Sequence, residues 1–143
     1  MEFDTILCHY AEVGLKLGNR RFFENWLRQN IKAALNRTIP NKNFTVRRLY
    51  GRIMIELDDD PIINHEEITQ ALSNTFGLAY FAFAKYVAQE IKGIREMALA
   101  ALQDKEFDTF KIKTRRPDQQ FLFTAQQVNE DVGAFILSKM DKT

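Results

Sequence analysis

Residues 12–35, EVGLKLGNRRFFENWLRQNIKAAL, decide the fold of the first half of this chain. The pattern predicts a helix over residues 20–36, with Asn19 at the N-cap, where its side chain is expected to accept a backbone N–H bond. On a helical wheel the apolar residues form one ridge, which comprises Phe23, Leu27, Ile31 and Leu35 and is widened by Phe22 and Trp26. Arg21, Arg28 and Lys32 fall on the opposite side. The ridge needs a sheet or a helix to cover it, and the basic row faces water or an anion.

The segments around this helix predict an α+β fold. Residues 4–10 are a short apolar strand, and residues 44–50 and 52–57 are two strands joined by a tight turn at Gly51. A second helix is expected from Asn64 or His65, with an inward face of Ile68, Ala71, Leu72 and Phe76, and is stopped by Gly77. Residues 78–88 are the last strand. The order strand, helix, strand, strand, helix, strand is the ferredoxin-like split βαβ arrangement, which we assign to a first domain of residues 1–88.

Residues 89–143 are expected to form a second, smaller α/β domain. A helix is predicted over residues 90–104 and a strand over residues 107–114, with Phe110 and Ile112 on one face and Lys111 and Lys113 on the other. After a turn at residues 115–118, a helix is predicted over residues 124–140. Its apolar set is Val128, Val132, Ala134, Phe135 and Leu137.

Composition predicts a soluble, cytoplasmic protein with no membrane association. The chain has 143 residues, of which 45% are hydrophobic and 27% charged, with no span long enough for a bilayer and no signal peptide at the start. The single cysteine, Cys8, excludes an internal disulfide and fits a reducing compartment. Cys8 and His9 lie in an apolar strand without metal-ligand partners at useful spacing, so we interpret both as structural and expect no metal site.

The net charge of +1 hides an uneven distribution. Residues 1–55 carry ten Lys or Arg against four Asp or Glu, whereas residues 56–69 carry six acids and no Lys or Arg. This segregation permits a one-sided positive field suited to nucleic acid. Ordinary solvated faces explain the same numbers equally well.

Two basic rows are the candidate RNA-binding residues. One is Lys111, Lys113, Arg115 and Arg116; the other is Arg21, Arg28 and Lys32. Arginine can bridge two phosphate oxygens, and phosphate contacts dominate affinity for nucleic acid. Nearby aromatics, Tyr50, Phe121 and Phe123, are able to stack on unpaired bases, although residues such as Phe121 and Phe123 are most often core residues under a loop.

Several motifs resemble one family. The run Glu12-Val13-Gly14-Leu15-Lys16, with Asn19-Arg20 and Phe23-Glu24, resembles the pattern E-I-x-L-K-G-x-N-R-x-x-F-E of the tRNA 4-thiouridine synthetases, the ThiI-type tRNA sulfurtransferases. Gly51-Arg52 and Phe76-Gly77-Leu78 are similar to the family's turns. Arg116-Pro117-Asp118, Phe121 and the run from Val128 to Gly133 resemble the R-x-D-x-x-F and I-N-x-x-V-G motifs of the THUMP domain, an RNA-binding module. Departures include Leu17 for glycine, Gln119 for lysine, Leu122 for proline, Ala125 for serine and Gln127 for glutamate; Thr124 can replace the lost serine cap.

The resemblance implies a tRNA-binding region, with the acceptor end of tRNA presented to a separate ATP-dependent thiolation domain that makes 4-thiouridine. It also implies a homodimer and the family's link to thiamine biosynthesis. The THUMP domain is expected to be truncated, because complete ones continue with further strands. The sequence has no phosphate-binding loop, no S-G-G-x-D-S motif and no loop cysteine for a persulfide. We therefore predict no catalytic residue and no cofactor in this chain, with ATP and Mg²⁺ expected only at a catalytic pyrophosphatase-type domain or subunit.

Two alternatives remain open. The near-zero net charge, Gln119 and the shortened THUMP pattern also fit a degenerate or truncated homologue that acts as a protein-interaction module. The THUMP part could instead belong to another tRNA-modifying enzyme, such as a methyltransferase, although the signature at residues 12–24 argues against this.

Overall fold

The structure, a computed structural model, describes residues 3–10, 19–40, 42–49, 51–57, 62, 65–116 and 120–140. The chain divides into two compact units, Glu2–Tyr86 and Val87–Thr143. The predicted domain boundary after residue 88 lies two residues from this division. Within the described ranges, every helix is too short or too polar to cross a bilayer.

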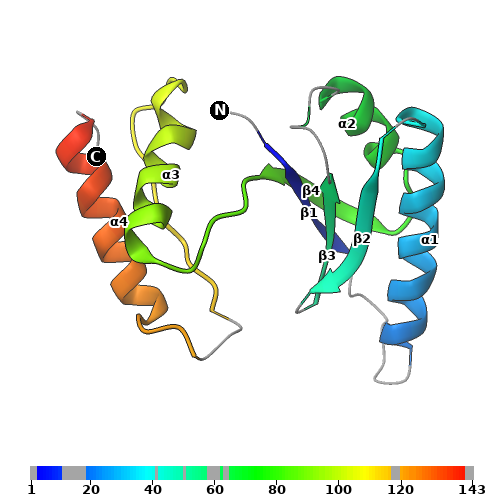
Figure 1. The fold of residues 1–143 in the computed structure, drawn as a ribbon, viewed down its shortest axis with the longest axis horizontal. Helices are drawn as coiled ribbons and strands as arrows, with labels where there is room; N and C mark the ends of the chain where they lie inside the picture. Colours follow the sequence, from blue (N-terminus) through cyan, green and yellow to red (C-terminus); the bar gives the residue numbers. More distant parts are fainter. Residues whose placement is uncertain are drawn as a thin grey trace. The chain divides into compact units, whose positions relative to one another are not determined.

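The described residues of the first unit form one four-stranded sheet and two helices (Figure 1). Its elements in chain order are β1 (Thr5–Tyr10), α1 (Arg20–Thr38), β2 (Phe44–Leu49), β3 (Arg52–Leu57), α2 (His65–Ser73) and β4 (Leu78–Ala84). The strand order is β2-β3-β1-β4, and each neighbouring pair is antiparallel. The predicted ferredoxin-like arrangement is therefore confirmed.

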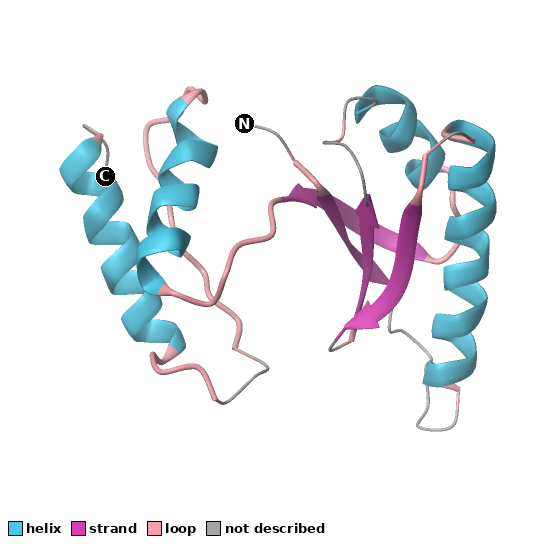
Figure 2. Cartoon of the chain, viewed as in Figure 1, coloured by secondary structure: helices cyan, strands magenta, loops and turns pink. Residues whose placement is uncertain are grey.

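Both helices cover the same face of this sheet (Figure 2). The ridge of α1 is buried as predicted, since Leu27, Ile31 and Leu35 are inaccessible to solvent and Phe23 packs beside them. On β1 and β3, alternate residues such as Cys8 and Ile55 point into the same core, which is the period-two pattern of a sheet with one covered face.

Four details of the first unit differ from the predictions. Phe22 and Phe76 were expected on buried faces, but their side chains are 76% and 78% exposed. The Asn19 side chain makes no capping bond, and the Asn19 main-chain carbonyl accepts the Phe23 N–H at 2.9 Å. Helix α2 ends at Ser73, four residues before Gly77, because the chain enters a turn in which Thr75 N–H bonds to the Leu72 carbonyl. Strand β4 likewise ends at Ala84 rather than at residue 88.

Two glycines fix the turns of this unit. Gly51 joins β2 and β3 with φ of +78°, a conformation that side-chain-bearing residues rarely adopt. Gly77 has φ of +102° and lies so close to α1 that an added Cβ would be 3.1 Å from Leu27 Cδ1 and 3.3 Å from rings of Phe23 and Trp26. The α2–β4 turn therefore rests directly on α1.

A carboxylate ties the start of β1 to the end of β4. Asp4 accepts the Tyr86 N–H at 3.1 Å and the Thr5 hydroxyl at 2.9 Å, and Lys85 Nζ lies 3.2 Å away. Burial alone would raise the pKa of Asp4, but these three donors together hold it below its ordinary value of 3.8.

Where it is described, the second unit forms two helices, α3 (Ile91–Gln103) and α4 (Ala125–Lys139). Its core is formed by Val128, Val132 and Ile136 of α4, with Ile94, Ala98 and Leu102 of α3 packed against them. Ala134 and Leu137 were predicted to face the core but are exposed, whereas Ile136 is buried. The reason is that residues 128, 132 and 136 form the inward row of the helix.

The strand predicted over residues 107–114 does not form. Among the described residues this segment pairs with no other strand, so it lacks the ladder of backbone hydrogen bonds that defines one. The alternation that suggested a strand is nevertheless present, since Phe110 and Ile112 pack against the α3–α4 core while Lys111 and Lys113 are exposed.

Candidate nucleic-acid interface

The segment after α3 presents a basic edge built by the packing of its alternate residues. From residue 109 to residue 116, exposed and partly buried side chains alternate without a break. Ile112 lies against α4, where an added Cβ on Gly133 would be 3.9 Å from Ile112 Cγ1. Thr114 donates its hydroxyl hydrogen bond to Asn129 Oδ1 of α4 at 2.6 Å. These contacts fix the segment, so that Lys111, Lys113 and Arg115 all face solvent.

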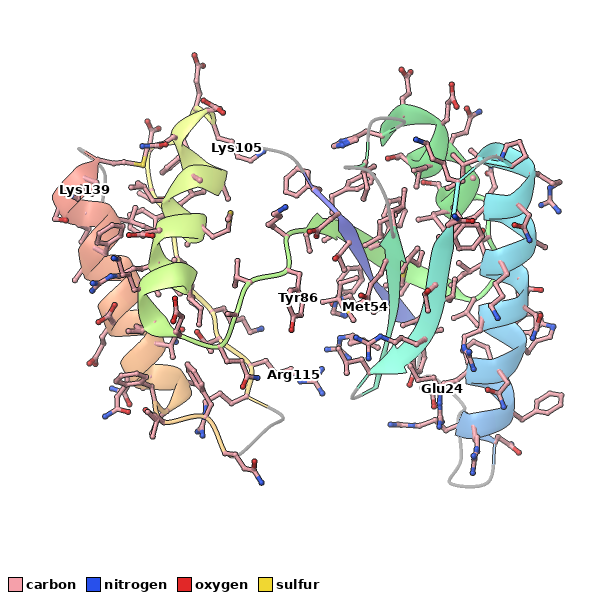
Figure 3. The ribbon with its side chains drawn as sticks, viewed as in Figure 1. Glu24, Met54, Tyr86, Lys105, Arg115 and Lys139 are labelled. Carbon is pink, nitrogen blue, oxygen red and sulfur yellow. The ribbon has the colours of Figure 1, made fainter. Side chains whose placement is uncertain are left out.

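The four predicted residues of this edge differ in their surroundings. Lys111 and Lys113 form no ion pair with any residue that the structure describes. The exposed Arg115 side chain extends away from the helices of its unit (Figure 3). Arg116 is half-buried and donates from Nη2 to the Phe121 carbonyl at 2.9 Å, which holds the loop before α4. Lys111 and Lys113 are therefore the members whose charge no described carboxylate offsets, and Arg115 lies with them on the exposed side of the segment.

The loop before α4 is structural where it is described. Phe121 and Phe123 contact each other with ring centres 5.9 Å apart and pack against the α3–α4 core, in agreement with the core interpretation of these rings. Thr124 caps α4 with a complete capping box, in which its hydroxyl accepts the Gln127 N–H and the Gln127 side chain accepts the Thr124 N–H. Thr124 thus supplies the cap that Ala125 cannot. Residues 117–119, including Gln119, lie outside the described residues, as do residues 11–18, Tyr50 and Asp58–Asp60.

The second predicted row, on α1, is less uniform. Arg21 is exposed, but Arg28 donates from Nε and Nη2 to the Val46 carbonyl of β2, at 3.2 and 3.1 Å. Lys32 is half-buried and lines a shallow hollow of about 360 Å³ with Asn36 and Phe44. The union of this row with the Lys111–Arg116 edge into one surface stays a prediction.

The arginines of the β2–β3 hairpin are engaged within the first unit. Arg47 Nε lies 2.7 Å from Glu56 Oε1, and Arg48 Nη1 lies 3.5 Å from Glu24 Oε1. Glu24 is buried between α1 and the sheet (Figure 3). The glutamate of the Phe23-Glu24 motif therefore has a structural contact, because it forms an ion pair with Arg48 at the edge of the core.

Cys8 is not suited to nucleophilic chemistry. Its side chain is fully buried beneath the helices, and this burial raises the pKa of the Cys8 thiol to about 12. At neutral pH the group is a thiol that solvent does not reach. The interpretation of Cys8 as a structural residue agrees with this environment.

Sequence reasoning missed a set of exposed aromatic and amide side chains between α1 and α2. Phe76 lines a groove together with Asn30, Arg37 and Asn74, and its ring contacts that of Trp26. The available signal was the excess of apolar positions on α1, where Phe22 and Trp26 make the ridge wider than the core requires.

Comparison with known proteins matches both units. The family model of the ThiI ferredoxin-like domain matches residues 5–82, and that of the THUMP domain matches residues 88–143. A probable tRNA sulfurtransferase of Moorella thermoacetica is 32% identical over 136 residues, which are 95% of this chain and 33% of that protein. One from Geobacillus sp. (strain WCH70) is 35% identical over 143 residues, or 99% of this chain and 34% of that protein.

Two solved structures share the fold. A 4-thiouridine synthetase in complex with RNA and with bound ATP superimposes with a TM-score of 0.72 at 25% identity, covering 98% of this chain and 34% of the other. PH1313 from Pyrococcus horikoshii Ot3 gives a TM-score of 0.78 at 24% identity, covering 97% and 46%. The chain spans about a third of the length of the curated relatives that it matches. The elements of the first unit follow the predicted order, and both family models match. The chain therefore belongs to the ThiI family and comprises its ferredoxin-like domain followed by a THUMP domain.

Proposed function

We propose that this chain is the tRNA-binding region of a ThiI-type tRNA sulfurtransferase and that it holds the acceptor end of tRNA for a separate thiolation domain. The observation that carries the proposal is the exposed row Lys111, Lys113 and Arg115 on a segment anchored by Phe110 and Ile112. The relatives named as tRNA sulfurtransferases and the RNA-bound 4-thiouridine synthetase support tRNA as the ligand.

The spacing of this row suits a sugar-phosphate backbone. In an extended segment, alternate side chains on one face are about 6.6 Å apart. Three cations at that spacing can contact phosphates along one strand without any reading of base sequence. Binding by such a row is therefore expected to depend on the shape and charge of the acceptor end and to fall steeply with salt.

ATP and Mg²⁺ belong, in this proposal, to the separate domain. The chain has no phosphate-binding loop, and within the described residues no three acidic, histidine or cysteine side chains lie together as metal ligands do. We assign to this chain only the binding and orientation of tRNA, and to the whole enzyme a homodimeric, cytoplasmic form.

Fluorescence anisotropy with labelled RNA tests the proposal. At low salt the chain should bind whole tRNA and an acceptor-stem minihelix with its 3′ single-stranded end, with affinities that agree within a few-fold. An anticodon stem-loop of equal length is the control and should bind at least about tenfold more weakly. Equal binding of both hairpins, or no binding of tRNA at low salt, would exclude acceptor-end recognition.

A further inference from the structure

The helix layer of the first unit contains a groove of about 500 Å³ between the C-terminal half of α1 and the end of α2. Ala34 and Ala71 form part of its lining, while Asn30, Arg37, Asn74 and Phe76 supply the larger side chains. This volume is within the range of small-ligand sites. The groove lies wholly within the first unit, so it is separate from the Lys111–Arg115 row on the second.

The polar groups of the groove fall into two classes. Thr38 and Thr75 donate their hydroxyl hydrogens to the carbonyls of Ala34 and Ala71, at 2.8 and 2.9 Å, and are therefore already bonded. Asn30, Arg37 and Asn74 make no side-chain hydrogen bond or ion pair with any described residue. Each amide can donate a hydrogen bond to the edge of a nucleobase and accept one from it. The guanidinium can donate two parallel hydrogen bonds to one phosphate.

An exposed aromatic ring is held at the mouth of the groove. Phe76 is 78% exposed, yet its ring meets Trp26 edge-to-face with centres 5.7 Å apart and planes at 78°. The next residue, Gly77, lies against Phe23, Trp26 and Leu27, so the turn that bears Phe76 is positioned by α1. A fixed aromatic with an open face is a platform on which an unpaired base can stack.

The charge around the groove favours an anion. Arg37 is the one charged side chain among the described residues that line it. The acids in the first turn of α2, Glu66 and Glu67, are not part of this lining. The lining therefore offers a positive charge to a phosphate.

We propose that this groove binds one unpaired nucleotide of an RNA strand. The base stacks on Phe76, Asn30 and Asn74 bond to its edge, and Arg37 binds the adjoining phosphate. The inference goes beyond the proposed function, because it adds a second contact for single-stranded RNA, and rests on that function only in taking RNA as the ligand.

Trp26, the single tryptophan of the chain, provides the readout, since a base stacked on the neighbouring Phe76 should quench its fluorescence. The experiment titrates the full chain with a single-stranded tetraribonucleotide at low salt. Saturable quenching is expected. Phe76→Ala should weaken binding roughly 5- to 150-fold, and Phe76→Tyr should retain it. Arg37→Gln should weaken binding and lower the salt slope by about 0.7. The control is Phe22→Ala, which removes an equally exposed ring that does not line the groove and should change affinity less than twofold.

Four results would overturn the proposal. The first is an absence of saturable quenching by the tetranucleotide up to millimolar concentration, which would leave the groove to a protein segment. The second is equal weakening by Phe76→Ala and Phe22→Ala. The third is quenching by AMP alone as strong as by the tetranucleotide, which would indicate a free nucleotide. The fourth is light scattering that shows a dimer lost in Phe76→Ala while RNA affinity is unchanged, which would assign the groove to a second copy. Lys111→Gln with Lys113→Gln, which tests the acceptor-end proposal, should leave the tetranucleotide signal intact, so the two proposals fail independently.

Discussion

Replacing Lys111 and Lys113 together by glutamine removes two positive charges that both face solvent and have no carboxylate partner among the described residues. Each cation that neutralises a phosphate contributes about 0.7 to 0.9 to the slope of log K against log salt concentration. Two such contacts predict a slope that is smaller by about 1.4 to 1.8. If the affinity extrapolated to 1 M salt is unchanged, tRNA binding at 0.1 M salt should weaken by about 25- to 60-fold.

The assay is fluorescence anisotropy of labelled tRNA at five or more salt concentrations, from about 0.05 M to about 0.3 M. Over this range log K is expected to fall linearly with the logarithm of the salt concentration. The matched control is Lys92→Gln with Lys105→Gln, which removes the same charge from exposed positions of the same unit. Both variants should keep wild-type stability, because their side chains are exposed. An identical loss of slope in the two variants would show that only net charge matters and would refute the assignment of a localised edge.

Three further predictions concern the fold. Gly77→Ala should lower the free energy of unfolding by about 3 kcal/mol, and Gly51→Ala by only about 1 kcal/mol. Both glycines have positive φ, but only Gly77 has side chains within 3.3 Å of the new Cβ. Urea unfolding measures both losses, and equal losses would contradict the close approach of Gly77 to α1. Since burial raises the pKa of Cys8 from 9.0 to about 12, the folded state disfavours its thiolate, so stability should be intact below pH 9 and fall by up to about 1.4 kcal/mol per pH unit from there towards pH 12. A Cys8→Ala variant should lack this part of the alkaline loss, and a native chain that reacts rapidly with a thiol reagent at pH 8 would disprove the burial. Thr124→Ala should cost about 1 kcal/mol by removing the cap of α4, whereas Ser138→Ala, on an exposed turn of the same helix, should cost less; thermal unfolding compares the two.

Local hydrophobic periodicity was sufficient to predict the elements of the first unit, because each pattern fits one type of secondary structure with one buried face. The Leu27–Ile31–Leu35 row and the alternation at Ile53 and Ile55 both describe faces that meet in one core, and the order of elements leaves few ways to connect them. The same reasoning failed where hydrophobicity and burial separate. Phe22 and Phe76 are as apolar as Phe23, and only the tertiary structure shows that they remain in contact with water.

The second unit shows a different limit. Alternation at Phe110 and Ile112 correctly predicted which side chains are inward, but a strand also requires a partner for its backbone, and sequence periodicity carries no information about that partner. For the candidate site, charge identified Lys111 and Lys113. It could not distinguish them from Arg116 and Arg28, whose guanidinium groups bond to backbone carbonyls.

The Arg28 contact has a consequence for association between chains. Strand β2 is at one margin of the sheet, where unpaired peptide groups could recruit a strand from another molecule and start aggregation. Arg28 donates two hydrogen bonds to the Val46 carbonyl on this strand, and the next two residues of the strand, Arg47 and Arg48, are charged. We therefore expect Arg28, which sequence reasoning assigned to nucleic acid, to hinder the addition of a further strand at this margin of the sheet.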